Sequence, residues 1–295
     1  MQFFKLKVTS DSPGKLGRFL QKNGFSKRAI INSNHHQGMI LVNHKRRHTS
    51  FHLKKNDEVI FILGQEKENS FLKPSNKKVN IVFETNDYLI VNKEAGVLSI
   101  PSRYEDSDAV VNRLLSYLRQ ENKKAKPHIV TRLDRDTSGL VLVGKNSVAQ
   151  ARFSEMNKKT FIKKYHAIVH GNFAQEELVG VIDEPIGKKD ETVKRYVVAS
   201  GKPSQTKYRV LAQKKGASLV ELQLFTGRTH QIRVHMEHLG HPLYGDTLYG
   251  IKDNFKRQAL HCFLLSYPDP FTSKEQQIEI PDPEDMKNLW NSLDN

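Results

Sequence analysis

A polar stretch at residues 65–78, QEKENSFLKPSNKK, most constrains how this chain can fold. Pro74 interrupts it, and proline lacks the backbone donor that a helix interior or a central strand needs. We therefore interpret residues 65–78 as a linker. It divides the chain of 295 residues into a small unit at residues 1–64 and a large unit at residues 79–295.

The large unit mixes helical and strand patterns without strict alternation. Helical spacing of apolar residues covers residues 108–124, 147–159 and 230–240, with Ser147 as a candidate cap and Gly240 as the end of the third helix. Strand patterns are found at residues 80–96 (two strands around a turn), 138–145, 161–171, 204–213 and 217–227. This mixture predicts the α+β class, with a mixed, largely antiparallel sheet flanked by helices rather than a doubly wound parallel sheet.

Charge and composition limit the partners. Lys and Arg number 47 against 32 Asp and Glu, and the net charge of +15 suits a polyanion because each neutralised phosphate releases counterions. A basic soluble protein without such a partner would have the same composition. The single cysteine, Cys262, excludes an internal disulfide and a cysteine-based zinc cluster. No apolar segment resembles a signal peptide or reaches membrane-spanning length, so we expect a soluble cytoplasmic protein without a membrane partner and, by default, a monomer.

The small unit is strongly basic. Two helical segments meet at a turn at Asn23-Gly24, and strand patterns follow at residues 38–43 and 57–63. Ser26-Lys27-Arg28 at the second helix, with a strand turn at His44, resembles the alpha-L RNA-binding module, in which glycine is usual at the latter position. A small α/β module of this kind would bind the RNA backbone by shape through Lys15, Arg18, Lys27, Arg28, Lys45 and Arg46. A solvated basic face on a structural module is the alternative.

The segment at residues 130–146, VTRLDRDTSGLVLVGKN, holds a candidate nucleophile. Arg-Leu-Asp at residues 132–134 leads through a polar turn into an apolar strand. A carboxylate on such a loop, beside arginines and above a rigid sheet, can stay ionised while partly desolvated, as a carboxylate nucleophile must. By itself the segment also fits a polar turn in which Asp134 pairs with Arg132 or Arg135.

Two further segments carry candidate site residues. At residues 226–250, the run Arg-Thr-His-Gln at residues 228–231 leads from a strand into a helix that bears Arg233. Two arginines at such a junction can pair with a carboxylate or grip phosphates. At residues 161–171, Tyr165 lies on a strand whose alternate residues face a core or a cleft. For one tyrosine on an apolar strand, a core position is the ordinary explanation.

Together these segments resemble the RluA/RluD type of large-subunit ribosomal pseudouridine synthase in order, spacing and residue identity, over roughly residues 79–286. The matching motifs are VNKEAGVLSIPS at residues 91–102, Thr131-Arg132-Leu133-Asp134 with Thr137-Ser138-Gly139, the alternating Lys163, Tyr165, Ala167, Val169 and Gly171, the segment from Gly227 to Gly250, and the closing ALHCFLLSYPDPFT and IEIPDPEDM. Two residues depart from the family pattern: Glu94 replaces a proline and Thr131 replaces a histidine. Neither position holds the nucleophile.

The resemblance implies a pseudouridine synthase fold with a central cleft. The first candidate for its substrate is large-subunit ribosomal RNA, and the second is transfer RNA. In this family an aspartate attacks the nucleoside, the N-glycosidic bond breaks, and the uracil turns and rejoins through carbon. Asp134 inherits that role, and the carbon it attacks stays open. Arg233 would pair with Asp134, Tyr165 would pack on the uracil, and Arg132 would fill the space of the extruded nucleotide. Further substrate contacts are expected from Arg228, His230 and Gln231. Because the reaction is an internal rearrangement, no metal, nucleotide or redox cofactor is expected.

Two other functions compete with this interpretation. A metal-dependent nuclease could use the histidines that lie close in sequence, His230, His235, His238 and His241, but no cysteine or carboxylate cluster completes a ligand set. A catalytically inactive RNA-binding protein would keep the basic surface. It would be expected to lose the carboxylate first, since a partly buried charge is costly without a use. Because the whole set of catalytic candidates is intact, we favour an enzyme.

Overall fold

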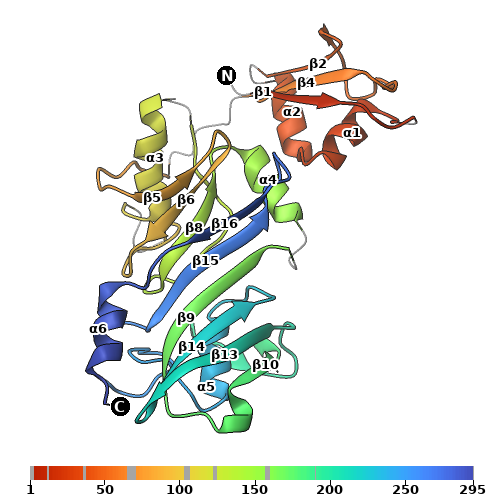
Figure 1. Ribbon diagram of the computed structural model, residues 1–295. Helices are drawn as coiled ribbons and strands as arrows, with labels where there is room; N and C mark the ends of the chain where they lie inside the picture. Colours follow the sequence, from red (N-terminus) through yellow and green to blue (C-terminus); the bar gives the residue numbers. More distant parts are fainter. Residues whose placement is uncertain are drawn as a thin grey trace.

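The computed structural model describes residues 3–11, 13–35, 38–64, 71–102, 107–121, 125–156, 160–189 and 191–294. A four-stranded sheet forms the N-terminal end of the molecule, and a ten-stranded sheet runs through the rest (Figure 1). None of the helices in these ranges combines the length and the hydropathy that crossing a bilayer requires.

The N-terminal unit is an antiparallel sheet in the order β1-β4-β2-β3 with two helices. Its elements are β1 (Phe3–Lys7), α1 (Leu16–Lys22), α2 (Lys27–His35), β2 (Met39–Val42), β3 (Lys45–Arg46) and β4 (Glu58–Ile62). Gly24 lies between the two helices with a φ of +80°, which glycine adopts without steric cost. Asn43 and His44 form the turn between β2 and β3 with φ values of 47° and 64°, so a histidine here takes a backbone conformation that favours glycine.

The large sheet has the path β10-β13-β14-β9-β15-β8-β6-β5, with β16 added beside β15 and β7 beside β8. The strands are β5 (Asn80–Glu84), β6 (Tyr88–Lys93), β7 (His128–Ile129), β8 (Ser138–Gly144), β9 (Ile162–His170), β10 (Val179–Asp183), β13 (Gln205–Lys214), β14 (Ala217–Leu224), β15 (Leu260–Pro268) and β16 (Glu275–Glu279). β8 and β15 pair in parallel, and the other described pairings of this sheet are antiparallel. The predicted mixed, largely antiparallel sheet is confirmed.

Gly139 makes the parallel contact between β8 and β15 possible. Its φ is +114°, and a Cβ at this position would collide with the backbone of Cys262. Only glycine therefore allows the two strands to approach so closely. This contact brings the loop that precedes β8 to the middle of the sheet, where the site described below is built.

Helices flank the large sheet (Figure 1). They are α3 (Val110–Glu121), α4 (Ser147–Glu155), α5 (Gln231–His238) and α6 (Glu284–Ser292), with a short 3-10 helix η1 (Gln175–Glu177) and a small hairpin of β11 (Ile186–Gly187) and β12 (Tyr196–Val197). The predicted helices at residues 108–124, 147–159 and 230–240 correspond to α3, α4 and α5, although residues 122–124 and 157–159 lie outside the described ranges. The predicted cap of α4 is wrong: Asn146, not Ser147, accepts the hydrogen bond from the Ala149 amide at 2.8 Å.

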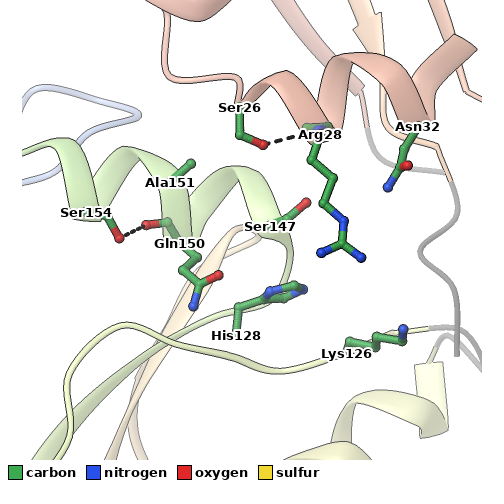
Figure 2. A pocket seen from close by; sticks show the side chains of 10 residues that line it. Ser26, Arg28, Asn32, Lys126, His128, Ser147, Gln150, Ala151 and Ser154 are labelled. Atoms are coloured by element: carbon green, nitrogen blue, oxygen red, sulfur yellow. Dashed lines mark hydrogen bonds between the residues drawn. The ribbon is translucent and has the colours of Figure 1, made fainter. Parts of the chain in front are cut away.

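The N-terminal unit packs against the large unit through an arginine among aromatic rings. The guanidinium of Arg152, on α4, lies 4.6 Å from the ring centre of Phe271, 5.5 Å from that of Phe25 and 5.6 Å from that of Phe4. Its Nη1 also donates to the carbonyl of Pro270 at 3.3 Å. Phe4 and Phe25 come from the N-terminal unit, so this cluster joins the two units and holds α2 opposite α4 (Figure 2).

The predicted linker at residues 65–78 is only partly visible. Residues 65–70 lie outside the described ranges, so the domain boundaries stay a prediction. The later part of the linker contacts α3 and the residues before it: Ser75 donates to Asp108 at 3.0 Å, and Asn112 donates to the carbonyl of Lys73 at 2.7 Å. This part of the linker is therefore fastened to the large unit.

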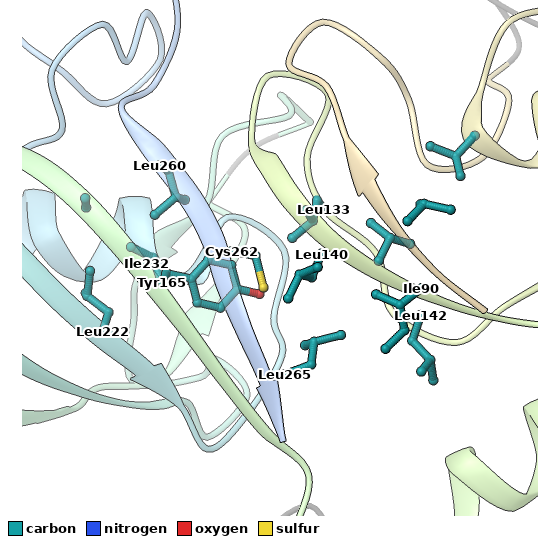
Figure 3. Close-up of a cluster of buried hydrophobic side chains, with 14 of the residues drawn as sticks. Ile90, Leu133, Leu140, Leu142, Tyr165, Leu222, Ile232, Leu260, Cys262 and Leu265 are labelled. Carbon is teal, nitrogen blue, oxygen red and sulfur yellow. The ribbon is translucent and has the colours of Figure 1, made fainter. Parts of the chain in front are cut away.

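The main hydrophobic core fills the middle of the large unit. Figure 3 shows Tyr165 and Cys262 side by side within it, between leucines of β8 and β15 and Ile232 of α5. Leu133, which precedes the candidate nucleophile, is only 9% exposed and belongs to the same cluster. Burial of Leu133 therefore anchors the loop that carries Asp134.

Candidate active site

The loop of Asp134 is fixed at both ends by hydrogen bonds. The Ser99 hydroxyl donates to the carbonyl of Leu133 at 2.9 Å and accepts from its amide at 3.1 Å. The hydroxyl of Thr131 accepts from the amide of Leu142 at 2.9 Å, so Thr131 has a structural contact of its own. The amide of Thr137 closes the turn on the carbonyl of Asp134 at 3.2 Å. The carboxylate is thus presented by a loop with little freedom to move.

Lys93, at the end of β6, connects the loop of Asp134 to the segment at residues 94–97. Its ammonium donates to the carbonyls of Glu94, Val97 and Arg135 at 2.8, 2.7 and 2.8 Å, and the residue is only 2% exposed. Burial lowers the pKa of Lys93 to about 7, against the pull of the nearby carboxylates of Asp136 and Asp134. Sequence reasoning missed this residue, although the lysine of VNKEAG was the available signal.

Arg233 of α5 joins Asp134 to a second carboxylate. Its Nη1 donates to Asp134 Oδ2 at 3.2 Å, and its Nε and Nη2 donate to Asp246 at 2.6 and 2.8 Å. Burial opposes both charges, yet the mutual hydrogen bonds raise the pKa of Arg233 and lower the pKa of Asp246. The side chain of Asp246 is 0% exposed, whereas that of Asp134 is 31% exposed. The buried carboxylate therefore holds the arginine, and the arginine holds the exposed carboxylate.

His230 lies on the other side of Asp134. Its Nε2 is 3.9 Å from Asp134 Oδ2, and its Nδ1 is 2.9 Å from the hydroxyl of Tyr249. That hydroxyl accepts from the amide of Arg195 at 2.7 Å, an arrangement that favours donation of its own proton to Nδ1 and leaves the ring proton on Nε2. Burial lowers the pKa of His230, which favours the neutral ring. His230 thus directs an N–H toward Asp134. Tyr249 was not singled out from the sequence.

Tyr165 forms the floor of the site. It is 4% exposed, and burial holds the pKa of its hydroxyl well above the usual value, so the group stays protonated. Its hydroxyl lies against the thiol of Cys262 (Figure 3), and burial raises the pKa of that thiol to about 12. Tyr165 is therefore both a core residue and part of the cleft.

Asp134, Arg233, His230 and Tyr165 line one cleft of about 700 Å³. The lining includes every residue that the sequence predicted for catalysis or substrate contact: Arg132, Asp134, Tyr165, Arg228, His230, Gln231 and Arg233. A volume of this size accommodates a small ligand such as a nucleoside. A carboxylate at the side of the cleft, an arginine pairing with it and an aromatic floor together suit nucleophilic attack on a ligand that is partly removed from water.

Three of the residues predicted to contact the substrate differ in solvent exposure and in their hydrogen bonds to the protein. Arg132 is exposed on the wall of the cleft. Arg228 donates twice to the carbonyl of Pro203, each time at 3.1 Å. Gln231 is 2% exposed, and its side-chain amide is fully engaged within the protein. Its oxygen accepts from the Thr226 hydroxyl and the Arg228 amide, and its nitrogen donates to the Gln205 carbonyl and the Thr206 hydroxyl. The geometry favours a positioning role for Gln231.

The residues predicted to bind RNA all lie on the N-terminal unit, and all are exposed: Lys15, Arg18, Lys27, Arg28, Lys45 and Arg46. None of them lines the cleft. The histidines considered as metal ligands contact separate partners. His235 bonds with Thr206 and the carbonyl of Glu184, and His241 bonds with the carbonyl of His170. In the described part of the chain, no three potential ligands converge on one point.

Comparison with known proteins agrees with the motifs. Residues 87–238 match the family model described as RNA pseudouridylate synthase. The chain is 38% identical over 269 residues to the RNA pseudouridine synthase YjbO of Bacillus subtilis, covering 90% of this chain and 94% of that protein. It is 36% identical over 255 residues to ribosomal large subunit pseudouridine synthase D of Yersinia pestis, covering 80% and 77%.

Solved structures show the same fold. The human RNA pseudouridylate synthase domain containing 4 superposes with a TM-score of 0.60 at 21% identity, covering 72% of this chain and 92% of that one. The human RNA pseudouridylate synthase domain containing 1 gives a TM-score of 0.56 at 28% identity, covering 74% and 87%. The fold class expected from the sequence is confirmed.

Proposed function

The chain belongs to the RNA pseudouridine synthase family, whose members are isomerases, and we propose that it converts uridines of large-subunit ribosomal RNA into pseudouridine with Asp134 as the nucleophile. Two observations support the substrate: the similarity to ribosomal large subunit pseudouridine synthase D, and the net charge of +15. The observation that carries the role of Asp134 is its place in the cleft, opposite Arg233 and above Tyr165.

The pairing with Arg233 suits a carboxylate nucleophile. Because Asp246 already takes two of the arginine's donors, Arg233 is held in place and offers Nη1 to a single oxygen of Asp134. The other oxygen of Asp134 stays available to a substrate. A fixed positive charge faces the carboxylate, and the side chain of Asp134 is exposed enough, at 31%, to reach a ligand in the cleft.

The net reaction is balanced within the nucleoside. The bond between the ribose C1′ and N1 breaks, a bond between C1′ and C5 forms, and a proton leaves C5 while one is gained at N1. During this exchange the uracil must turn without leaving the site, and Tyr165 supplies an aromatic surface on which the ring can rest. The Nε2 proton of His230 faces the reacting carboxylate and can donate a hydrogen bond to an oxygen of the substrate.

Arg132 fits the task of holding the RNA open. The target base of a structured RNA must leave its stack before it can enter the cleft. Arg132 is exposed at the cleft, two residues before the nucleophile. Its guanidinium can occupy the space that the extruded nucleotide leaves and bond with neighbouring bases or phosphates.

The test is isomerisation of RNA by the purified protein. In vitro transcribed large-subunit ribosomal RNA is incubated with the enzyme, and pseudouridines are mapped by carbodiimide-based sequencing, in parallel with RNA from cells with and without the gene. We expect new pseudouridines at defined positions in ribosomal RNA. Pseudouridines confined to transfer RNA would contradict the proposed substrate, and none in either RNA would indicate an inactive RNA-binding protein.

A further inference from the structure

A second cavity lies between the N-terminal unit and the large unit (Figure 2), and none of its described lining residues lines the catalytic cleft. It encloses about 600 Å³ between α2, the length of α4 from Ser147 to Ser154 and the segment at residues 126–128. We propose that this groove binds phosphates of the RNA backbone, so that both units of the protein hold the same stretch of substrate. This inference rests on the proposed function, since it assigns a further contact to the same RNA.

The lining of the groove has the donors that phosphate contacts use. Arg28 projects into it from α2, facing Lys126 and His128 from the large unit (Figure 2). Ser147 and Gln150 add polar groups from α4, and among the described residues no aspartate or glutamate lines it. Arginine, lysine, serine and glutamine side chains are the usual partners of phosphate oxygens in nucleic-acid complexes. The described lining is positive and polar, which favours a polyanion over a metal ion or an apolar ligand.

The start of α2 adds to the positive potential of the groove. Ser26 accepts from the amide of Ala29 at 3.1 Å and so caps α2, while Asn146 caps α4. α2 therefore begins at the groove with Arg28 in its first turn, whereas α4 lines the groove along its length. The partial positive charge at a helix start attracts anions. It supplements the side chains here.

The groove is built on a fixed contact. The cluster of Arg152 with Phe4, Phe25 and Phe271 joins α4 to the N-terminal unit. Because one wall of the groove is α4 itself, this contact sets the distance between Arg28 and the residues opposite it. A site that is preformed in this way binds without first having to order its two halves.

The groove and the cleft are connected by one short segment. Lys126 and His128 line the groove, and residues 130–135 line the cleft. Asp134 lies eight positions after Lys126, and even a fully extended chain of that length spans no more than about 29 Å. One folded RNA can therefore contact both sites, and a phosphate held in the groove would help to place its target uridine over Asp134.

The experiment measures binding of the full-length protein to in vitro transcribed large-subunit ribosomal RNA across a series of salt concentrations. The variants are Arg28→Gln, Lys126→Gln and the double variant, with Lys287→Gln as a control. Lys287 carries the same charge on α6, at the end of the molecule away from the N-terminal unit (Figure 1), and pairs with Glu284 at 2.8 Å. All three positions lie at the surface or partly exposed, so the substitutions should leave the fold intact.

We expect each groove substitution to weaken binding by on the order of tenfold and to lower the slope of log K against log salt by about 0.7–0.9. Because both side chains face the same phosphates, the double variant should lose less than the product of the single losses. Lys287→Gln should bind like the wild type. Groove variants that bind like Lys287→Gln, or single losses that multiply without coupling, would overturn the shared groove. Pseudouridine formation by the wild type is scored on the same RNA, so its absence would overturn the proposed function separately.

Discussion

Replacing Asp246 by asparagine would test whether the buried carboxylate of Asp246 stabilises the fold and orients Arg233 toward Asp134. The side chain of Asp246 is 0% exposed and accepts from two donors of Arg233, at 2.6 and 2.8 Å, as well as from the amides of Leu248 and Tyr249. Asparagine has nearly the same shape but carries no charge. Its NH₂ group would also face an arginine N–H instead of accepting from it.

The loss of stability follows from the burial. Removing one partner of a buried ion pair costs about 3–5 kcal/mol, because the other charge stays desolvated. At about 2.1 cal/mol/K of unfolding entropy per residue over 295 residues, that is a fall in Tm of about 5–8 °C. Arg233 would also lose the contact that orients it toward Asp134, and misplacement of a positioning group lowers the catalytic rate by on the order of 10².

The assay is calorimetric unfolding together with single-turnover isomerisation. Asp285→Asn is the matched control, since Asp285 also bonds with two donors of an arginine, Arg257 at 2.6 and 2.9 Å, but is 46% exposed. The Arg257 side chain is 9% exposed, about as buried as that of Arg233, but the exposed Asp285 lets water reach the donors that asparagine would leave without a charged partner. We therefore expect the control to lose less stability than Asp246→Asn and to keep its activity. Equal losses of stability in the two variants, or full activity in Asp246→Asn, would refute the argument from burial.

Three further predictions concern other contacts of the site and of the docked N-terminal unit. Because burial lowers the pKa of Lys93 to about 7 while the unfolded value is about 10.4, the unfolded chain binds more protons above pH 7. The free energy of unfolding of the wild type, measured in urea relative to that of Lys93→Met, should therefore rise by about 2–3 kcal/mol from pH 6 to pH 9. A difference between the two proteins that stays constant over this range would contradict the prediction. Arg132→Ala should slow single-turnover isomerisation more on a hairpin than on a linear oligomer of the same target sequence, because only the hairpin requires unstacking; equal losses would favour an electrostatic role beside Asp134. Arg152→Ala should weaken the docking of the N-terminal unit by about 2–4 kcal/mol through loss of contacts with three aromatic rings, so amides around Phe25 should exchange faster, and unchanged exchange would show that the cluster is not needed.

Much of the cleft could be predicted because its motifs are local. Asp134, Tyr165 and Arg233 each lie in a short run with a recognisable pattern, and the structure places all three around one cleft. Asp246 and Lys93 could not be assigned a role from the sequence. What they do depends on which groups the fold brings to them, such as the Arg135 carbonyl, 42 residues from Lys93.

The N-terminal unit shows the same division. Its helices and the turn at Gly24 are predicted by local residue spacing. The contact of Phe25 with Arg152 is not, because neither the segment around Phe25 nor the segment around Arg152 indicates it alone. Phe25 and Arg152 meet across a long stretch of chain, and a cation stacked on rings leaves no periodic signal in the sequence. The cap of α4 was misassigned for a smaller reason: Asn146 and Ser147 are adjacent, and both are good caps.

The central claim, that Asp134 is the nucleophile, is tested most directly by Asp134→Asn. Asparagine keeps the shape and an oxygen that can accept from Arg233, but its amide is not nucleophilic. The account predicts normal folding, RNA affinity close to that of the wild type, and single-turnover pseudouridine formation reduced by on the order of 10⁴ or more. Asp136→Asn, the same change two residues further along the loop, should stay active. Pseudouridine formation by Asp134→Asn at a rate near that of Asp136→Asn would contradict the mechanism.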